Sequence, residues 1–166
     1  MSVKVTKVLF LCTGNSARSI MAEAVMNKEG AGKFDAFSAG SHPVGSVNPY
    51  ALDLLTAKGC TVEDLRSISW DEFTGPAAPA FDFIFTVCDN AAGEVCPVGS
   101  GHPMTAHWGL RDPAAVAGSD ADKRAAFAAA YGEIESRVRA FMKLPLDSLD
   151  FPALQRELEA VGERVR

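Results

Sequence analysis

The segment VLFLCTGNSARS, residues 8–19 of the 166-residue chain, restricts the possible folds more than any other part of the sequence. Residues 7–11, which include the apolar start of this segment, have the length and composition of a strand buried on both faces of a parallel sheet. Cys12 ends this strand, and a short polar loop follows. Apolar residues at helical spacing come next: Ile20, Met21, Ala24 and Val25. Strand, loop and helix in this order predict a parallel α/β sheet with right-handed crossovers.

Apolar and amphipathic stretches alternate along the rest of the chain. Their patterns predict three more strands, at 36–39, 81–87 and 104–108. They predict further helices at 49–58, 70–73, 123–141 and 152–161. Asp120 or Asp122 is the predicted cap of the long helix at 123–141. We expect a main domain at 1–144 and a C-terminal helical extension at 145–166 that packs on the same domain.

The net charge of -5 makes the chain a poor general binder of nucleic acid or of an anionic membrane. No apolar run approaches the ~18 residues of a membrane span, and the N-terminal run is too short for a signal peptide. We therefore expect a cytoplasmic protein without nucleic-acid or membrane partners. Thiols stay reduced in that compartment, so its four cysteines predict packing or redox roles rather than a disulfide framework.

The loop between Cys12 and Arg18 has the properties of an oxyanion site. Its backbone N–H groups can curl around a tetrahedral anion, and the following helix adds its positive end. Arg18 supplies a planar fork that can hold two oxygens at once. Gly14 and Asn15 are residue types that tolerate a positive φ in a tight loop. The predicted anion-binding residues are Thr13, Gly14, Asn15, Ser16, Ala17, Arg18 and Ser19.

Cys12 is the candidate nucleophile of this site. Thiolates are favoured at helix N-termini and beside arginine, so we expect a lowered pKa for Cys12. Ser19 is expected to donate a hydrogen bond to that thiolate. The result would be a charged sulfur under a bound oxyanion. The alternative is a buried, inert Cys12 that ends a strand by chance, with Arg18 on the surface.

Asp112 is the candidate general acid. It precedes Pro113, which keeps it out of the helical region and lets its carboxyl project from an extended turn. A carboxylic acid opposite the nucleophile can protonate a leaving oxygen. The alternative is that Asp112 and Pro113 only form a turn, as most such pairs do.

Cys88 lies at the carboxyl end of a predicted strand, as Cys12 does, and ligands bind at that edge of a parallel sheet. A helix between Cys88 and Cys96 would place them about 12 Å apart along its axis. A disulfide needs Cα atoms within about 7 Å, so their pairing would require segment 89–95 to unwind. This segment is therefore a candidate redox-driven flap. The alternative is two unrelated cysteines, one in the core and one on the surface.

Cys60, which follows a predicted helix, is interpreted as a packing residue. The sequence contains no CxxC pair, and its three histidines lack the spacing of a zinc finger. No firm metal site is predicted from these residues.

Taken together, these motifs resemble the low-molecular-weight tyrosine phosphatases and, more closely, the arsenate reductases built on that fold. The resemblance covers about residues 5–141. Beyond residues 8–19 it rests on several motifs in one order: 37–40, 47–49, 65–67, 69–73, 85–88, 96–97, 107–109 and 112–113. It implies a single domain with a four-stranded parallel sheet flanked by helices.

The resemblance also implies the roles of an arsenate reductase. Cys12 would attack arsenate held by Arg18 and the loop amides, and Asp112 would protonate the departing hydroxide. Cys88 would attack the sulfur of the arsenic adduct and release arsenite. Cys96 would then attack Cys88, leaving a Cys88–Cys96 disulfide for thioredoxin to reduce.

Three departures from the reductase pattern bear on these implied roles. The spacing from Cys88 to Cys96 is one residue longer than in the thioredoxin-coupled members, and glutathione with glutaredoxin, or mycothiol, is the alternative reductant. Thioredoxin-coupled members can bind potassium. Here Asn15, Glu23 and Ser38 match that site, but its expected Asp falls near Thr61. The segment from residue 145 onward extends past the part that matches.

Two other functions remain open at this stage. A low-molecular-weight tyrosine phosphatase is the first, although such enzymes carry tyrosines after the Asp-Pro pair, where this chain has Ala114 and Ala115. Arsenate and phosphate share charge and shape, so a residual phosphatase activity is expected in either case. The second is a non-catalytic oxyanion binder, which the complete set of Cys12, Arg18 and Asp112 argues against.

Overall fold

A four-stranded parallel sheet forms the centre of the computed structural model, which describes residues 5–75, 78–88, 103–146 and 148–163. The strand order is β2-β1-β3-β4. The strands are β1 (Thr6–Cys12), β2 (Phe34–Gly40), β3 (Phe83–Thr86) and β4 (Met104–His107). The helices are α1 (Arg18–Glu29), α2 (Pro49–Ala57), α4 (Asp120–Met142) and α5 (Phe151–Glu163). Two short 3-10 helices are η1 (Trp70–Phe73) and η2 (Pro113–Ala115). The predicted four-stranded parallel sheet is confirmed.

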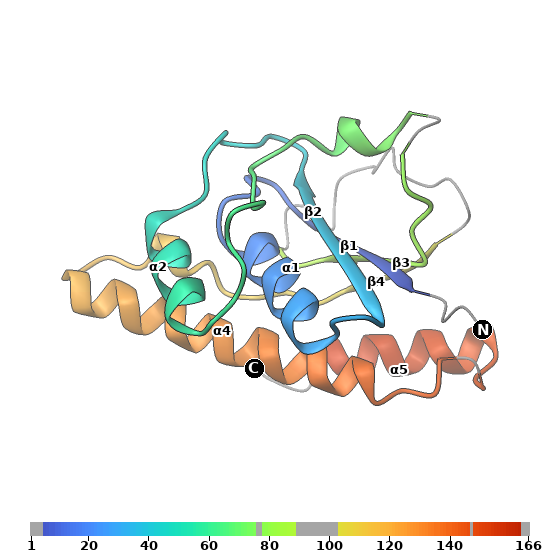
Figure 1. Ribbon diagram of the computed structural model, residues 1–166. Helices are drawn as coiled ribbons and strands as arrows, with labels where there is room; N and C mark the ends of the chain where they lie inside the picture. Colours follow the sequence, from blue (N-terminus) through green and yellow to red (C-terminus); the bar gives the residue numbers. More distant parts are fainter. Residues whose placement is uncertain (1–4, 76–77, 89–102, 147, 164–166) are drawn as a thin grey trace.

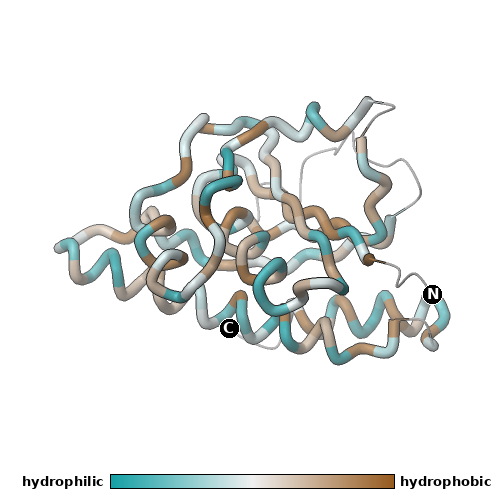
Figure 2. Tube along the Cα trace, viewed as in Figure 1, coloured by the Kyte–Doolittle hydropathy of each residue, from teal (hydrophilic) through white to brown (hydrophobic). Residues whose placement is uncertain are grey.

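The larger part of the core lies between one face of the sheet and the helices. Helix α1 packs on β1 and β2, α5 packs on β4, and α4 contacts α1, α2 and α5 (Figure 1). The opposite face has a smaller cluster, in which Leu9, Leu11 and Ile84 are covered by aromatic side chains that include Phe73 of η1. Hydrophobic residues concentrate along the central strands in Figure 2. This burial on both faces explains why β1 reads as a continuous apolar run.

An aromatic stack joins the sheet to the segment that follows β4. The ring of Trp108 stacks on Phe85 with centroids 3.9 Å apart, and Phe141 of α4 meets Trp108 edge-on at 5.8 Å. The Trp108 indole also donates a hydrogen bond to the Leu158 carbonyl of α5 at 3.0 Å. The chain after β4 is thus anchored in the core before it reaches Asp112.

The register of the sheet brings three strand ends to one edge. Cys12 at the end of β1 pairs with Gly40 at the end of β2. On the other side of β1, Leu11 pairs with Thr86, so Cys88 lies two residues beyond the end of β3. Both cysteines therefore lie at the carboxyl edge of adjacent strands, where the sequence predicts a ligand site.

The helix caps show one wrong prediction. Ser119 caps α4, whereas Asp120 or Asp122 was predicted, and the helix begins at Asp120 instead of residue 123. The Ser119 hydroxyl accepts from the Asp122 amide at 3.1 Å, and the Asp122 carboxylate accepts from the Ser119 amide at 3.0 Å. Asp122 is thus the third residue of a capping box, a place where an acid supports the cap without being the cap.

Smaller differences concern the strand ends. Strand β3 is shorter than the predicted 81–87, and β4 ends at His107 instead of residue 108. The predicted start of α2 at Pro49 is correct, and Asn48 is its N-cap. Gly59, two residues after the helix, has a φ of 81°. Helix α5 packs on β4 and α4, and the division of the chain at residue 145 stays a prediction.

In the described parts of the chain, no helix combines the length and apolarity that a membrane crossing requires.

Candidate active site

The loop from Cys12 to Arg18 turns its carbonyl groups outward. Three of them accept hydrogen bonds from amides of segment 42–48, at N···O distances of 2.8–3.0 Å: His42 to Thr13, Val44 to Gly14, and Asn48 to Ser16. A trans peptide plane directs the N–H of the next residue to the opposite side. The amides of residues 14, 15 and 17 therefore point toward the inside of the loop, which is the arrangement that binds an oxyanion.

Asn15 holds the loop in this shape. Its φ is 46°, and its side chain is fully buried. Its Nδ2 donates to Ser19 Oγ at 2.8 Å and to Ser38 Oγ at 3.0 Å, while its Oδ1 accepts from the Ile68 amide at 2.8 Å. These three bonds offset the cost of the left-handed conformation at a residue with a side chain.

Of the two residue types that tolerate a positive φ in this loop, Asn15 adopts one and Gly14 does not. Gly14 is not among the glycines in the left-handed region. A Cβ built on Gly14 would make an ordinary contact of 3.5 Å with Val44. One left-handed residue is enough to close the loop, so Gly14 is free to take a common conformation.

Gly40 is a site residue that the sequence analysis missed. It was interpreted only as the end of a strand. A Cβ at Gly40 would lie 2.5 Å from the Thr13 carbonyl oxygen and 2.9 Å from the Asn15 Cβ. The loop thus lies directly against the end of β2, and only glycine leaves room for it. The position of Gly40 beside Cys12 in the register is a signal that only the sheet topology provides.

The N-terminus of α1 carries no side-chain cap. Ala17 occupies the cap position and makes no capping hydrogen bond. Asp, Ser or Thr would ordinarily satisfy the first amides of a helix. Here these amides lie at the end of the loop that begins at Cys12, and an anion is a suitable partner for them.

Two thiols meet at this loop. Cys12 and Cys88 are both buried, and the Thr13 amide donates a hydrogen bond to Cys88 Sγ at 3.3 Å. The Thr13 hydroxyl lies 3.6 Å from the same sulfur. The hydrogen bond between the Cys12 and Cys88 side chains is the largest influence on the pKa of Cys12. The structure therefore brings the predicted nucleophile and the second predicted redox cysteine together.

The lowered pKa expected for Cys12 is wrong for this resting state. The hydrogen bond with Cys88 and the burial of the thiol raise the pKa of Cys12, and they outweigh the lowering by Arg18 and by the Gly14 amide. Two adjacent thiols share protons, and the charge of one disfavours ionisation of the other. Arg18 and the helix end can be recognised in the sequence, whereas the contact with the second thiol depends on the fold.

Ser19 is fully buried beneath the loop. Its Oγ accepts the hydrogen bond from Asn15. The hydrogen bond expected from Ser19 to the Cys12 thiolate stays a prediction.

Arg18 and Asp112 are neighbours across the site. Arg18 Nη2 lies 3.7 Å from Asp112 Oδ2, and Arg18 Nη1 donates to the Leu110 carbonyl at 3.1 Å. Asp112 also caps η2, because its Oδ1 accepts from the Ala114 amide at 3.0 Å. The Asp-Pro pair therefore forms the turn that was the alternative interpretation, and this turn places the carboxyl beside Arg18.

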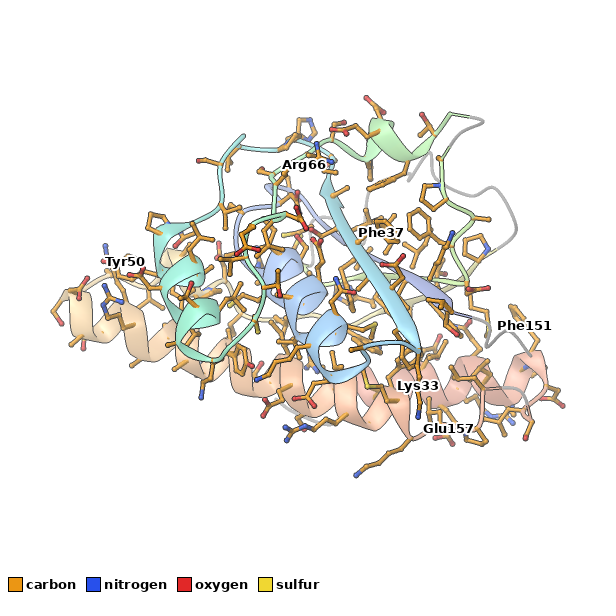
Figure 3. All side chains as sticks on the ribbon, viewed as in Figure 1. Lys33, Phe37, Tyr50, Arg66, Phe151 and Glu157 are labelled. Carbon is orange, nitrogen blue, oxygen red and sulfur yellow. The ribbon has the colours of Figure 1, made fainter. Side chains whose placement is uncertain are left out.

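Behind the loop, Asn15 is linked to a partly buried carboxylate. Ser38 Oγ donates to Glu23 Oε1 at 2.6 Å. Burial raises the pKa of Glu23 to about 7, against the lowering by the Ser38 hydrogen bond and by Arg66. Glu23 and Ser38 line a cleft of about 550 Å³, together with Phe37 and Arg66, which Figure 3 shows near β2.

The predicted potassium set is only partly suited to a cation. Glu23 and Ser38 present oxygen atoms of the kind that hard cations prefer. The Asn15 side-chain oxygen instead accepts from the Ile68 amide, and its NH₂ group faces Ser38. In the ranges that the structure describes, no group of three or more His, Cys, Asp and Glu residues could hold a metal ion.

The remaining cysteines are Cys60 and Cys96. Cys60 is buried in the main core cluster, which agrees with its interpretation as a packing residue. Cys96 and the proposed flap at 89–95 lie outside the described residues.

Comparison with known proteins gives the family of this chain. The model of the low molecular weight phosphotyrosine protein phosphatases matches residues 7–158. The chain belongs to this family. The match includes most of α5, which the motif resemblance had left out. Within the family, the chain is 37% identical to an arsenate reductase of Halalkalibacterium halodurans over 134 residues, which cover 81% of this chain and 93% of that relative.

Solved structures of family members agree with this assignment. An arsenate reductase in the phosphate binding state superposes with a TM-score of 0.64 at 26% identity, covering 81% of this chain and 95% of that one. A thioredoxin-dependent arsenate reductase of Corynebacterium glutamicum shares the fold, with a TM-score of 0.62 at 23% identity. That superposition covers 86% of this chain and 63% of the other, so this chain spans less than two thirds of that protein.

Replacement of Gly40 by alanine should damage the anion site without unfolding the protein. The added Cβ would push the Thr13 carbonyl and Asn15 out of place, so we expect the affinity for phosphate to fall by roughly tenfold or more. Titration calorimetry with inorganic phosphate measures this. Gly132→Ala is the control, since a Cβ there meets open space. Unchanged phosphate affinity in G40A would contradict the close contact.

Glu23 should make stability depend on pH. The folded protein retains the Glu23 proton up to a pH of about 7, whereas the unfolded chain releases it near 4.5. Between these values the folded state binds more protons, so its stability falls as the pH rises. Relative to E23Q, the wild type should lose roughly 2 kcal/mol of unfolding free energy across this window in potassium-free buffer.

Urea unfolding at several pH values checks this prediction. Glu63→Gln is the matched control, because Glu63 lines the same cleft but is exposed. Arg66 opposes the shift and Asp35 adds to it, so both remain unchanged in these variants. Parallel stability curves for wild type and E23Q would contradict the raised pKa.

Proposed function

We propose that this protein is an arsenate reductase that converts arsenate to arsenite with its own thiols. The observation that carries the proposal is the second thiol, Cys88, hydrogen-bonded to Cys12 and to the Thr13 amide inside the anion loop. Hydrolysis of a phosphate ester needs one nucleophilic thiol, whereas reduction of arsenate needs two electrons, which a pair of thiols can supply. The name of the Halalkalibacterium halodurans relative supports the same substrate.

In the first step, the inward amides of residues 14, 15 and 17 of the binding loop and the Arg18 guanidinium hold the arsenate oxygens. The Cys12 thiolate attacks arsenic, a sulfur–arsenic bond forms, and one arsenic–oxygen bond breaks. The departing hydroxyl group takes the proton of the Asp112 carboxyl and leaves as water. The distance of 3.7 Å between Arg18 Nη2 and Asp112 Oδ2 supports this role, because the acid lies beside the group that would orient the anion.

In the second step, the Cys88 thiolate attacks the Cys12 sulfur of the adduct. A sulfur–sulfur bond forms and the sulfur–arsenic bond breaks. The electron pair of that bond stays on arsenic, which is reduced from the pentavalent to the trivalent state and leaves as arsenite. The contact between the two thiols supports this order, because a charge on one sulfur raises the pKa of the other and keeps it protonated until the first has reacted.

In the third step, the Cys96 thiolate attacks Cys88, frees Cys12 and leaves a Cys88–Cys96 disulfide. An external thiol reductant then restores the dithiol. We propose thioredoxin for this role, with glutathione and glutaredoxin as the alternative that the longer cysteine spacing keeps open. A cycle of this kind needs a reducing compartment, which supports a cytoplasmic location.

A low-molecular-weight tyrosine phosphatase is the second candidate. The family assignment and the anion loop fit it equally well. Ala114 and Ala115 follow Pro113 within η2 and offer no aromatic surface for a phosphotyrosine ring. Residual hydrolysis of small phosphate esters is consistent with either candidate.

A potassium ion in the cleft behind the loop is a further part of the proposal. Glu23 and Ser38 would hold it, and its charge would stabilise the ionised Glu23 carboxylate. The hydrogen bond from Asn15 to Ser38 links this position to the loop. Occupancy would therefore favour the loop shape that binds the oxyanion.

A single turnover tests the reductase. Fully reduced protein mixed with arsenate, without external thiol, should release one arsenite per chain and lose two thiols. Cys88→Ser should abolish arsenite release, because no second thiol can break the sulfur–arsenic bond. Cys60→Ser is the control and should release arsenite as the wild type does, since Cys60 lies in the core.

The other outcomes separate the alternatives. Arsenite that forms only with added glutathione would exclude the role of Cys96 and favour a glutaredoxin route. No arsenite with any thiol, together with intact hydrolysis of a phosphate ester, would establish the phosphatase instead.

Potassium should raise the melting temperature of the wild type above pH 7, relative to sodium at equal ionic strength. The same comparison in E23Q should show no difference, because the carboxylate that attracts the ion is gone. Equal responses of both proteins to the two salts would rule out a cation held by Glu23.

A further inference from the structure

Arg137, a residue of α4, is almost completely buried, with 2% of its surface exposed. Its Nη1 donates to two successive main-chain carbonyls, those of Trp108 at 3.2 Å and Gly109 at 2.8 Å. These carbonyls belong to the segment that leads from β4 to Asp112. Burial of a guanidinium is costly unless it makes good hydrogen bonds, so its presence here calls for an explanation.

The next carbonyl along this segment is held by a second arginine. The Leu110 carbonyl accepts from Arg18 Nη1 at 3.1 Å. Two arginines from different helices, Arg137 of α4 and Arg18 of α1, therefore bind three successive carbonyls just before the acid. The amide of Leu110 also donates to the Val87 carbonyl at 3.1 Å, which ties the segment to the residue before Cys88.

We propose that Arg137 is a positioning residue for the general acid, which fixes the peptide planes of Trp108 and Gly109 so that Asp112 is presented at Arg18. This inference rests on the proposed function, in which Asp112 protonates the departing oxygen. Arg137 lies behind the segment and acts only through it.

The chemistry of arginine suits this task. A guanidinium is planar and directs its donors in fixed directions, so one nitrogen can serve two carbonyls while the group stays aligned. Lysine has a single ammonium on a flexible stem and would not set the two planes together. Gly109 lies between the held carbonyls and has the backbone freedom to rotate once they are released.

Arg137→Lys tests the proposal, with Arg137→Gln as a second variant. Single-turnover arsenite formation should slow by about tenfold to 10²-fold, as expected when an acid is misplaced by about 1 Å. The phosphate Kd should stay within about twofold of the wild-type value, because Arg18 and the loop amides are intact. Arg139→Lys is the matched control on the same helix, since Arg139 is exposed and pairs with Glu29 and Glu135.

A double-mutant cycle shows whether Arg137 acts through the acid. If it does, R137K combined with Asp112→Asn should be no more than about twofold slower than D112N alone. Losses that multiply would overturn the proposal, because they would give Arg137 an effect independent of Asp112. Wild-type rates in R137K would overturn it as well. So would a phosphate Kd that worsens in parallel with the rate, or the loss of phosphate binding in both variants.

Amide exchange separates this proposal from the proposed function. The Leu110 amide should lose protection in R137K and not in R139K, whether or not the protein reduces arsenate. A wild type that forms no arsenite would refute the reductase, while unchanged Leu110 protection in R137K would refute the role of Arg137.

Discussion

The hydrogen bonds of the buried Asn15 side chain are the interactions on which the site depends most. They close the anion loop in a conformation that would otherwise be unfavourable, and they connect three parts of the chain. Ser19 belongs to α1, Ser38 to β2, and Ile68 to the segment before η1. The loop geometry is therefore set by the mutual placement of the sheet and its first helix. The outward carbonyls follow from it, because a loop of another shape would neither expose those carbonyls to segment 42–48 nor direct its amides inward.

The local parts of this arrangement could be predicted from the sequence. An apolar run before Cys12 and helical spacing after Arg18 fix a strand, a loop and a helix, and Asn15 is the residue type that accepts a positive φ. The parallel sheet also places Cys12 and Cys88 at one edge. The sequence could not show Gly40 against the loop or Arg137 behind the acid segment, because both depend on contacts between distant parts of the chain. The error at the cap of α4 has a local origin, since Ser119 and Asp122 are both good capping residues and only geometry distinguishes their positions.

Electrostatics at the thiols shows why charge patterns alone are insufficient. Arg18 and the Gly14 amide favour a thiolate at Cys12, as the sequence indicates, but a neighbouring thiol and burial favour the protonated form more strongly. A single nucleophile would benefit from a fully lowered pKa at all times. A pair that must react in sequence needs one sulfur charged and the other still protonated. The structure fits the second situation, because the hydrogen bond between the two sulfurs raises the pKa of Cys12.

The register of β1 and β3 has a kinetic consequence. Adjacent parallel strands hold the two sulfurs near each other, because Cys12 ends β1 and Cys88 lies only two residues beyond the end of β3. The translational entropy of bringing a second thiol to the first is thus lost once, during folding. Well-oriented groups in one molecule can react as if present at about 10⁵ M or more. Glutathione at cellular concentrations is far more dilute than this, so in the proposed cycle Cys88 would react with the Cys12 adduct before a free thiol does.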